Sequence, residues 1–181
     1  MAEQKHVVLG VTGSIAAYKA ADIIRHLVMR RFKVSVAMTR EAECFIPPLT
    51  LSTLAGVQVC REMFGQEDHS WQMPHITLAQ DADVFLIAPA TAAVIGKIAH
   101  GIADNLLTCI ALATKAPVLI APAMNTQMYH HPIVQENCLK LEKQGIQLIK
   151  PVKGKLACGI IGEGHIAEVE TIVEAVARAM R

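Results

Sequence analysis

The 181-residue sequence predicts an α/β fold, in which helices cover both faces of a doubly wound parallel sheet in three αβα layers. Two observations predict this fold class. Short apolar runs alternate with helix-length patterns, which is typical of successive right-handed βαβ units. The composition is 52% hydrophobic but only 4% aromatic, and such an aliphatic core suits a sheet buried on both faces. The length predicts a single domain over residues 1–181.

The first half of the chain contains two strand–helix units. The apolar run HVVLGVT predicts a buried strand over 6–12, and Ser14 can cap a helix that continues to Arg31 with apolar residues on one side. The run KVSVAMT predicts the second strand over 33–39. Residues 41–56 should be helical, with an interruption at Pro47-Pro48.

The second half repeats the pattern. The runs DVFLIAPA (83–90) and PVLIAPA (117–123) predict two strands that each contain Ala-Pro near their end, with mostly helical chain over 92–114 between them. Pro132 suits the first turn of a helix that ends at Gly145. The run IQLIK (146–150) predicts the fifth strand, and 167–181 predicts a closing helix.

Charge and cysteine content exclude several classes of protein. Seventeen Lys and Arg against sixteen Asp and Glu leave a net charge of +1, so we expect no nucleic-acid partner. The longest apolar stretch is broken by Pro89, Gly96 and Lys97, so we expect no membrane span. Five cysteines without CxxC spacing indicate neither a disulfide framework nor a metal site. With no signal peptide visible, the expected location is the cytoplasm.

The stretch GVTGSIAAYK follows the first predicted strand. Gly10, Gly13 and Ser14, together with the N–H groups of the next helix, can form an anion site suited to phosphate. The spacing matches neither a full GxGxxG motif nor a P-loop, and a tight turn with a serine cap explains it equally well. Thr39, after the second strand, can supply another hydroxyl or simply cap a helix.

Two other polar residues stand near strand ends or turns. Asn125, in APAMNTQMYHHP, follows a strand, and its amide can orient a carboxylate or close an Asx turn. His75, in QMPHITLA, follows Pro74, and a lone histidine at such a place is usually structural or exposed. Cys158 lies in the glycine-rich stretch KLACGIIGEGH, where a loop cysteine without a role is the simpler interpretation.

Five motifs together carry a family resemblance. GSIAAYK, PHITLA, APATAAVIGKIAHGIADNLLT, APAMNTQMYHHP and KLACGIIGEG occur in this order and cover nearly the whole chain. In them the sequence resembles the homo-oligomeric flavin-containing cysteine decarboxylases. The resemblance implies a Rossmann-like or flavodoxin-like fold that binds FMN and assembles as a trimer or a dodecamer built of trimers. It further implies decarboxylation of the cysteine moiety of 4′-phosphopantothenoylcysteine to 4′-phosphopantetheine in coenzyme A biosynthesis.

The resemblance also implies roles for individual residues. It makes His75 and Cys158 catalytic, with the Cys158 thiol as proton donor, and Asn125 a ligand of the substrate carboxylate and amide. Lys155 and Ala157 would lie on a flap over the substrate. The implied FMN contacts are Gly13, Ser14, Ile15, Thr39, Thr91, Ala92, Ala93, Val94 and Ala123.

The sequence departs from the family at two places. Ala93 stands where the family has asparagine, which leaves open one side-chain contact to flavin or to a neighbouring subunit. His165 and Val169 differ from the usual residues after the last glycine motif. Three alternatives to the stated substrate and activity are a decarboxylase of a peptide C-terminal cysteine, a flavin prenyltransferase, and a non-catalytic regulatory protein of the same fold. The PAMN and ACG motifs argue against the prenyltransferase.

Overall fold

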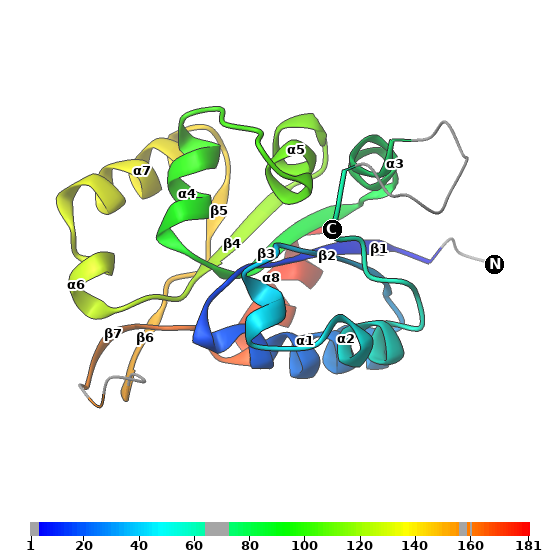
Figure 1. Ribbon diagram of the computed structural model, residues 1–181, viewed down its shortest axis with the longest axis horizontal. Coiled ribbons are helices and arrows are strands. Elements are labelled where there is room, and N and C mark those ends of the chain that lie inside the picture. Colours follow the sequence, from blue (N-terminus) through cyan, green and yellow to red (C-terminus); the bar gives the residue numbers. More distant parts are fainter. Residues whose placement is uncertain (1–3, 64–72, 156–158, 160) are drawn as a thin grey trace.

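A parallel five-stranded sheet forms the centre of the computed structural model, which describes residues 4–63, 73–155, 159 and 161–181 (Figure 1). Its strands are β1 (His6–Val11), β2 (Lys33–Met38), β3 (Val84–Ala90), β4 (Val118–Pro122) and β5 (Gln147–Leu148). They lie in the order β2-β1-β3-β4-β5, and all four pairings are parallel. This is the flavodoxin-like, doubly wound order, so the predicted fold class is confirmed.

Helices cover both faces of the sheet (Figure 1). One face carries α1 (Lys19–Met29), α2 (Pro48–Ala55) and α8 (Val169–Ala179), and the other carries α3 (Pro74–Asp81), α4 (Ala92–Ala99), α5 (Leu106–Ala113) and α7 (Pro132–Lys143). Three short elements lie in connections: the 3₁₀ turns η1 (Ile15–Tyr18) and η2 (Ala42–Cys44), and the helix α6 (Thr126–Tyr129). The helices therefore form the two outer layers that the sequence predicts.

The alternation of side chains along β1 explains the two-sided core. Leu9 and Val11 pack into the cluster formed with α1 and α8, whereas Val8 packs with Phe85 into the cluster on the α4–α5 face. Gly10 also lies inside this strand. A Cβ there would come within 2.8 Å of Leu107 Cδ1, so the glycine allows α5 to pack closely on the sheet.

The structure differs from the predicted elements in several places. Helix α3 was not predicted, and the glycine-rich stretch read as a loop contains an antiparallel hairpin of β6 (Val152–Lys155) and β7 (Ile161–His165). The helix predicted from Ser14 starts as the 3₁₀ turn η1, whereas the mostly helical chain predicted over 92–114 is present as α4 and α5. Strand β5 has only two residues and pairs with β4 alone, at one edge of the sheet.

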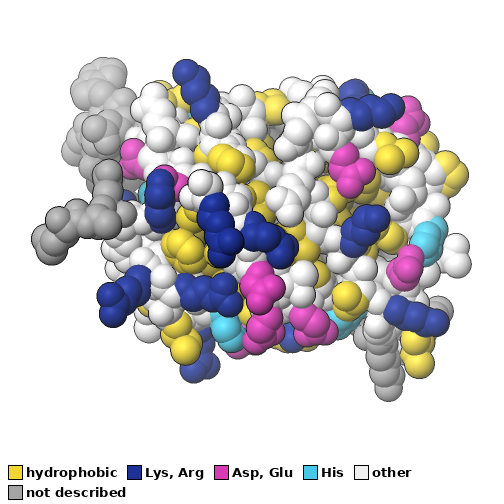
Figure 2. Space-filling view, turned by 180° about the vertical axis from the view of Figure 1, so that it is seen from behind, with side chains coloured by type: hydrophobic (Ala, Val, Ile, Leu, Met, Phe, Trp, Pro, Cys, Tyr) yellow, Lys and Arg dark blue, Asp and Glu magenta, His cyan; other side chains and the backbone are white. Residues whose placement is uncertain are grey.

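Surface charge is mixed in sign. Figure 2 shows Lys and Arg side chains interspersed with Asp and Glu on the face seen from behind. Within 4–63, 73–155 and 161–181, no helix has the length and apolar character needed to cross a bilayer. In the same ranges, no three His, Cys, Asp or Glu side chains are grouped so that they could hold a metal ion.

Candidate functional site

A cavity of about 610 Å³ lies at the carboxyl ends of the strands, and it is lined by residues of η1, of the connections after β3 and β4, and of strand β7. Seven of the residues predicted for the site line it: Gly13, Ser14, Ile15, Thr91, Ala92, Ala123 and Asn125. They are separated by up to 112 positions (125 − 13) in the chain. This edge of a doubly wound sheet is where ligands of such folds bind.

The η1 turn forms one wall. Ser14 is its N-cap: the hydroxyl accepts a hydrogen bond from the Ala16 N–H (3.3 Å) and donates one to the Ala123 carbonyl oxygen (3.2 Å). The side chain therefore joins the end of β1 to the end of β4. The predicted serine cap is therefore present.

Two further details of this wall concern Gly13 and Thr39. A Cβ on Gly13 would overlap Glu41 Cβ, so the turn cannot carry a side chain there. Thr39, whose N–H donates to the Val11 carbonyl oxygen at the end of β1, has a buried hydroxyl with no partner among the described residues. A buried hydroxyl without a partner is costly unless a ligand supplies one. Thr39 does not itself line the cavity.

Thr12 is a site residue that the sequence analysis did not single out. It is fully buried, and its hydroxyl donates to the Pro89 carbonyl oxygen (2.7 Å) and accepts from the Thr91 N–H (3.1 Å). The bond pair joins the end of β1 to the end of β3 beneath the cavity. The available signal was a polar side chain directly after an apolar strand, between two glycines.

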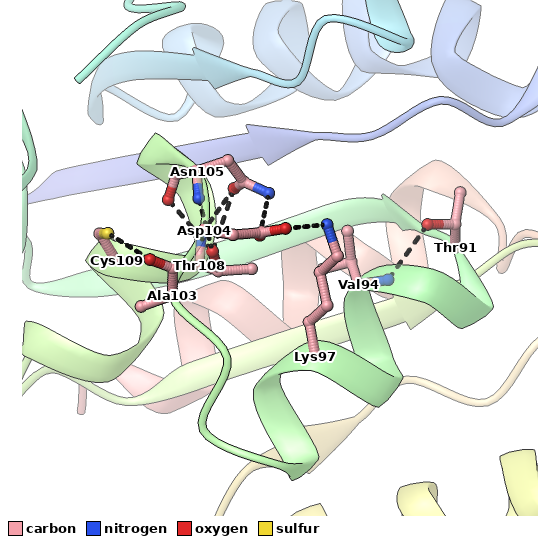
Figure 3. A network of polar contacts seen from close by, with 8 residues as sticks. All are labelled: Thr91, Val94, Lys97, Ala103, Asp104, Asn105, Thr108 and Cys109. Atoms are coloured by element: carbon pink, nitrogen blue, oxygen red, sulfur yellow. Dashed lines mark hydrogen bonds and ion pairs between the residues drawn. The ribbon is translucent and has the colours of Figure 1, made fainter. Parts of the chain in front are cut away.

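The start of α4 supplies the opposite wall. Thr91 is the N-cap, and its hydroxyl accepts from the Val94 N–H at 3.4 Å (Figure 3). Thr91 and Ala92 line the cavity, whereas Ala93 is exposed outside it and Val94 is buried in the core. The structure thus separates the four consecutive residues predicted to contact FMN into two that line the cavity and two that do not.

A polar network follows α4 and holds the connection to α5 (Figure 3). Lys97 Nζ lies 2.7 Å from Asp104 Oδ2, and this hydrogen bond lowers the pKa of the Asp104 carboxyl. Asn105 forms a capping box with Thr108: its Oδ1 accepts from the Thr108 N–H (3.0 Å), and its own N–H donates to the Thr108 hydroxyl (3.3 Å). These contacts fix the 100–105 connection that separates α4 from α5.

Asn125 stands where β4 gives way to α6. Its Oδ1 accepts a hydrogen bond from the Gln127 N–H at 2.8 Å, which is the Asx turn foreseen as the alternative to a substrate contact. The two roles are compatible, because the turn orients the amide while the residue remains exposed at the cavity. Carbonyl and NH₂ groups lie on the two branches of the amide, so a carbonyl held by Gln127 sets the direction of the NH₂ donors.

His75 lies in the first turn of α3, away from the cavity. Figure 1 shows α3 beside α5, whereas α6 and β7 lie toward the opposite side of the molecule. The Nδ1 atom of His75 is buried and has no hydrogen-bond partner among the described residues. Within one chain, His75 and Asn125 are therefore not brought together.

The flap residues are described only in part. Lys155 ends β6, and Ala157 and Cys158 lie outside the described residues. The described cavity lining includes His165 and the tyrosine Tyr18 but no carboxylate, lysine or arginine. A mostly apolar cavity with a few directed polar groups suits a flat ring system and the reacting part of a small substrate.

Comparison with known proteins gives consistent results. The family model described as Flavoprotein matches residues 1–181. A probable phosphopantothenoylcysteine decarboxylase of Streptococcus mutans is 46% identical over 172 residues, which cover 94% of this chain and 96% of that protein. The coenzyme A biosynthesis bifunctional protein CoaBC of Bacillus subtilis is 45% identical over 174 residues, and the chain spans only 43% of its length.

Solved structures agree with these sequences. A PPC decarboxylase cysteine-to-serine mutant complexed with pantothenoylaminoethenethiol superposes with a TM-score of 0.86 at 35% identity, covering 97% of this chain and 98% of that one. The FMN binding protein AtHal3 superposes with a TM-score of 0.82 at 37% identity, covering 97% and 96%.

Proposed function

The chain belongs to the Flavoprotein family, and on that premise we propose that it is an FMN-dependent phosphopantothenoylcysteine decarboxylase. It removes CO₂ from the cysteine moiety of 4′-phosphopantothenoylcysteine and yields 4′-phosphopantetheine for coenzyme A biosynthesis. The substrate follows from the relative that matches over nearly its whole length at 46% identity. Residues 1–181 act as a single domain, and the proposed location is the cytoplasm.

One observation of the structure supports this function most directly. The cavity joins a phosphate-type turn at Gly13–Ser14 to the Asn125 amide across a mostly apolar space. A flavin needs an anion site for its phosphate and an apolar slot for its ring, and the substrate needs a donor for its carboxylate beside that ring. FMN, when bound there, supplies reversible hydride acceptance, which turns the carbon bearing sulfur into an electron sink for loss of CO₂.

The protein's own residues then position the substrate and move its protons. Asn125 offers amide donors to the carboxylate, and the Asx turn holds that amide in one orientation. A neutral amide suits this place, because a carboxylate side chain would repel the substrate's own negative charge at close range. Cys158 donates the proton to the carbon that has lost CO₂. A thiol with the ordinary pKa of about 8.5 is mostly protonated at neutral pH and can therefore act as a donor.

The position of His75 implies an oligomer. His75 is proposed to handle substrate protons near the flavin, yet α3 lies away from the cavity of its own chain. We therefore place His75 in the cavity of a neighbouring subunit, close to that subunit's 91–105 segment. The assembly is a trimer or a dodecamer built of trimers.

The test is a direct assay of substrate choice. Purified protein should be yellow, release FMN on denaturation, and release CO₂ from 4′-phosphopantothenoylcysteine but not from a peptide with a free C-terminal cysteine. Recovery of another cofactor, or turnover of the peptide alone, contradicts the proposal. Light scattering on the active, flavin-loaded protein tests the assembly separately, because an active monomer excludes a shared site.

A further inference from the structure

The hairpin β6–β7 rests on the Asn125 turn through two glycines of β7. A Cβ on Gly162 would overlap Thr126 Oγ1, and a Cβ on Gly164 would overlap the Met124 carbonyl oxygen. The two strands of chain are also joined by a backbone bond, from the Met124 N–H to the Gly164 carbonyl oxygen at 3.0 Å. The residues before and after Asn125 are thus both in direct contact with the hairpin.

The contact at Gly162 is close. Thr126 Oγ1 is buried and packs against the glycine, and it has no hydrogen-bond partner among the described residues. Gly164 has φ +125°, which favours glycine. The ion pair between His130 Nε2 and Glu163 Oε2 (3.2 Å) is half exposed. Exposed ion pairs of this kind contribute little to stability. The glycine contacts therefore determine how closely the hairpin packs on the Asn125 turn.

The position of Asn125 is coupled to this contact. Its side chain is bonded to the Gln127 N–H, and the Tyr129 N–H donates to its carbonyl oxygen at 2.9 Å. A shift of Thr126 away from the hairpin would carry this whole turn with it. Asn125 and strand β7 should consequently move together.

We propose that Gly162 and Thr126 are positioning residues, whose contact sets the place of the Asn125 amide in the cavity. The inference rests on the proposed function, since it concerns the substrate carboxylate that Asn125 would bind. It adds a role that neither residue has in the reaction itself. A change in the position of the hairpin should then change the alignment of the substrate, because the Gly162–Thr126 contact links the hairpin to the Asn125 turn.

The test is a double-mutant cycle on the holoenzyme. Gly162→Ala places a methyl group against Thr126 and should lower kcat/KM by roughly 100-fold, the loss expected for a displacement of about 1 Å. Thr126→Ala removes the obstructing hydroxyl and methyl, and the double variant should recover most of that loss. FMN affinity should be unchanged in all variants, because neither residue lines the cavity. Ile161→Ala, an exposed neighbour in the same strand, serves as the hairpin control.

A second measurement asks whether the effect passes through Asn125. The probe is phosphopantothenoylserine, which keeps the carboxylate but has oxygen in place of sulfur. Gly162→Ala should weaken its binding in the wild-type background but not in an Asn125→Ala background. If Gly162→Ala does not fold, Thr126→Leu crowds the same contact from the other side and should lower kcat/KM as well.

The outcomes separate the two proposals. Wild-type protein that releases no CO₂ from 4′-phosphopantothenoylcysteine contradicts the proposed function. An active wild type with full activity in Gly162→Ala or Thr126→Leu overturns the positioning role. So does a loss that Thr126→Ala does not relieve, or an equal loss of binding in the Asn125→Ala background.

Discussion

Replacing Thr12 with valine should destabilise the protein and weaken FMN binding together. Thr12 is fully buried, and its hydroxyl is bonded to the Pro89 carbonyl oxygen and the Thr91 N–H. Valine fills nearly the same volume but makes neither bond. The perturbation therefore removes the hydrogen bonds between the ends of β1 and β3 and leaves the packing almost unchanged.

The size of the loss follows from the exposure of the two partners. Pro89 is buried, so its carbonyl oxygen loses its Thr12 partner at a cost of roughly 1–3 kcal/mol. Thr91 is partly exposed, so water can replace its partner and the loss is about 0.5–1.5 kcal/mol. The free energy of unfolding should fall by the sum of the two losses, about 1.5–4.5 kcal/mol. Thr12→Ser keeps the hydroxyl and loses one methyl group, which costs about 1 kcal/mol.

The assay is urea unfolding followed by circular dichroism, at one protomer concentration and with FMN either removed or saturating. Fluorescence titration then measures FMN affinity, which should fall in Thr12→Val because Thr91 and Ala92 line the cavity and depend on this bond. Equal stability and equal FMN affinity of the valine and serine variants would refute the reasoning, since the two differ mainly in the hydroxyl.

Three other predictions concern separate parts of the chain. Burial, with a smaller contribution from Lys33, lowers the pKa of His6, so the neutral form is favoured in the fold; stability should be complete above about pH 6.5 and decline as the pH falls further. Urea unfolding at several pH values should show a flatter profile for His6→Gln. Asn105→Ala removes the capping box of α5 and should lower the free energy of unfolding by about 1 kcal/mol, measured by urea unfolding against Ile102→Ala, an exposed residue of the same connection. Cys158→Ser should still release CO₂ but yield a product two hydrogens lighter than the normal one by mass spectrometry; normal product at the wild-type rate means that the cysteine has no such role.

The layered parallel architecture was predictable, and parts of its local structure were not. Strand and helix alternation predicts the three layers because each buried strand is a continuous apolar run. The hairpin was missed because β7 reads Ile-Gly-Glu-Gly-His, in which glycines replace the residues that normally indicate a strand. Helix α3 was missed because its eight residues begin without a side-chain cap and show little apolar periodicity.

The same distinction applies to the site. Gly13, Thr91 and Asn125 each follow a strand, and parallel strands bring their carboxyl ends to one edge, so their convergence follows from topology. Ala93 and Val94 diverge from Thr91 because successive helical residues point about 100° apart, and the sequence alone does not fix where the helix begins. His75 could not be placed from the sequence, since its distance from a cavity depends on how whole chains assemble.

The cavity exists because the chain leaves neighbouring strands in opposite directions. After β1 the chain turns into η1 and α1 on one face, and after β3 it turns into α4 on the other. The two connections separate, and a crevice opens between them at this switch point. Thr12 joins the two strands at this point, because its hydroxyl donates a hydrogen bond to the Pro89 carbonyl oxygen and accepts one from the Thr91 N–H. The topology thus provides the space, and the Thr12 hydroxyl joins the ends of β1 and β3 beside it.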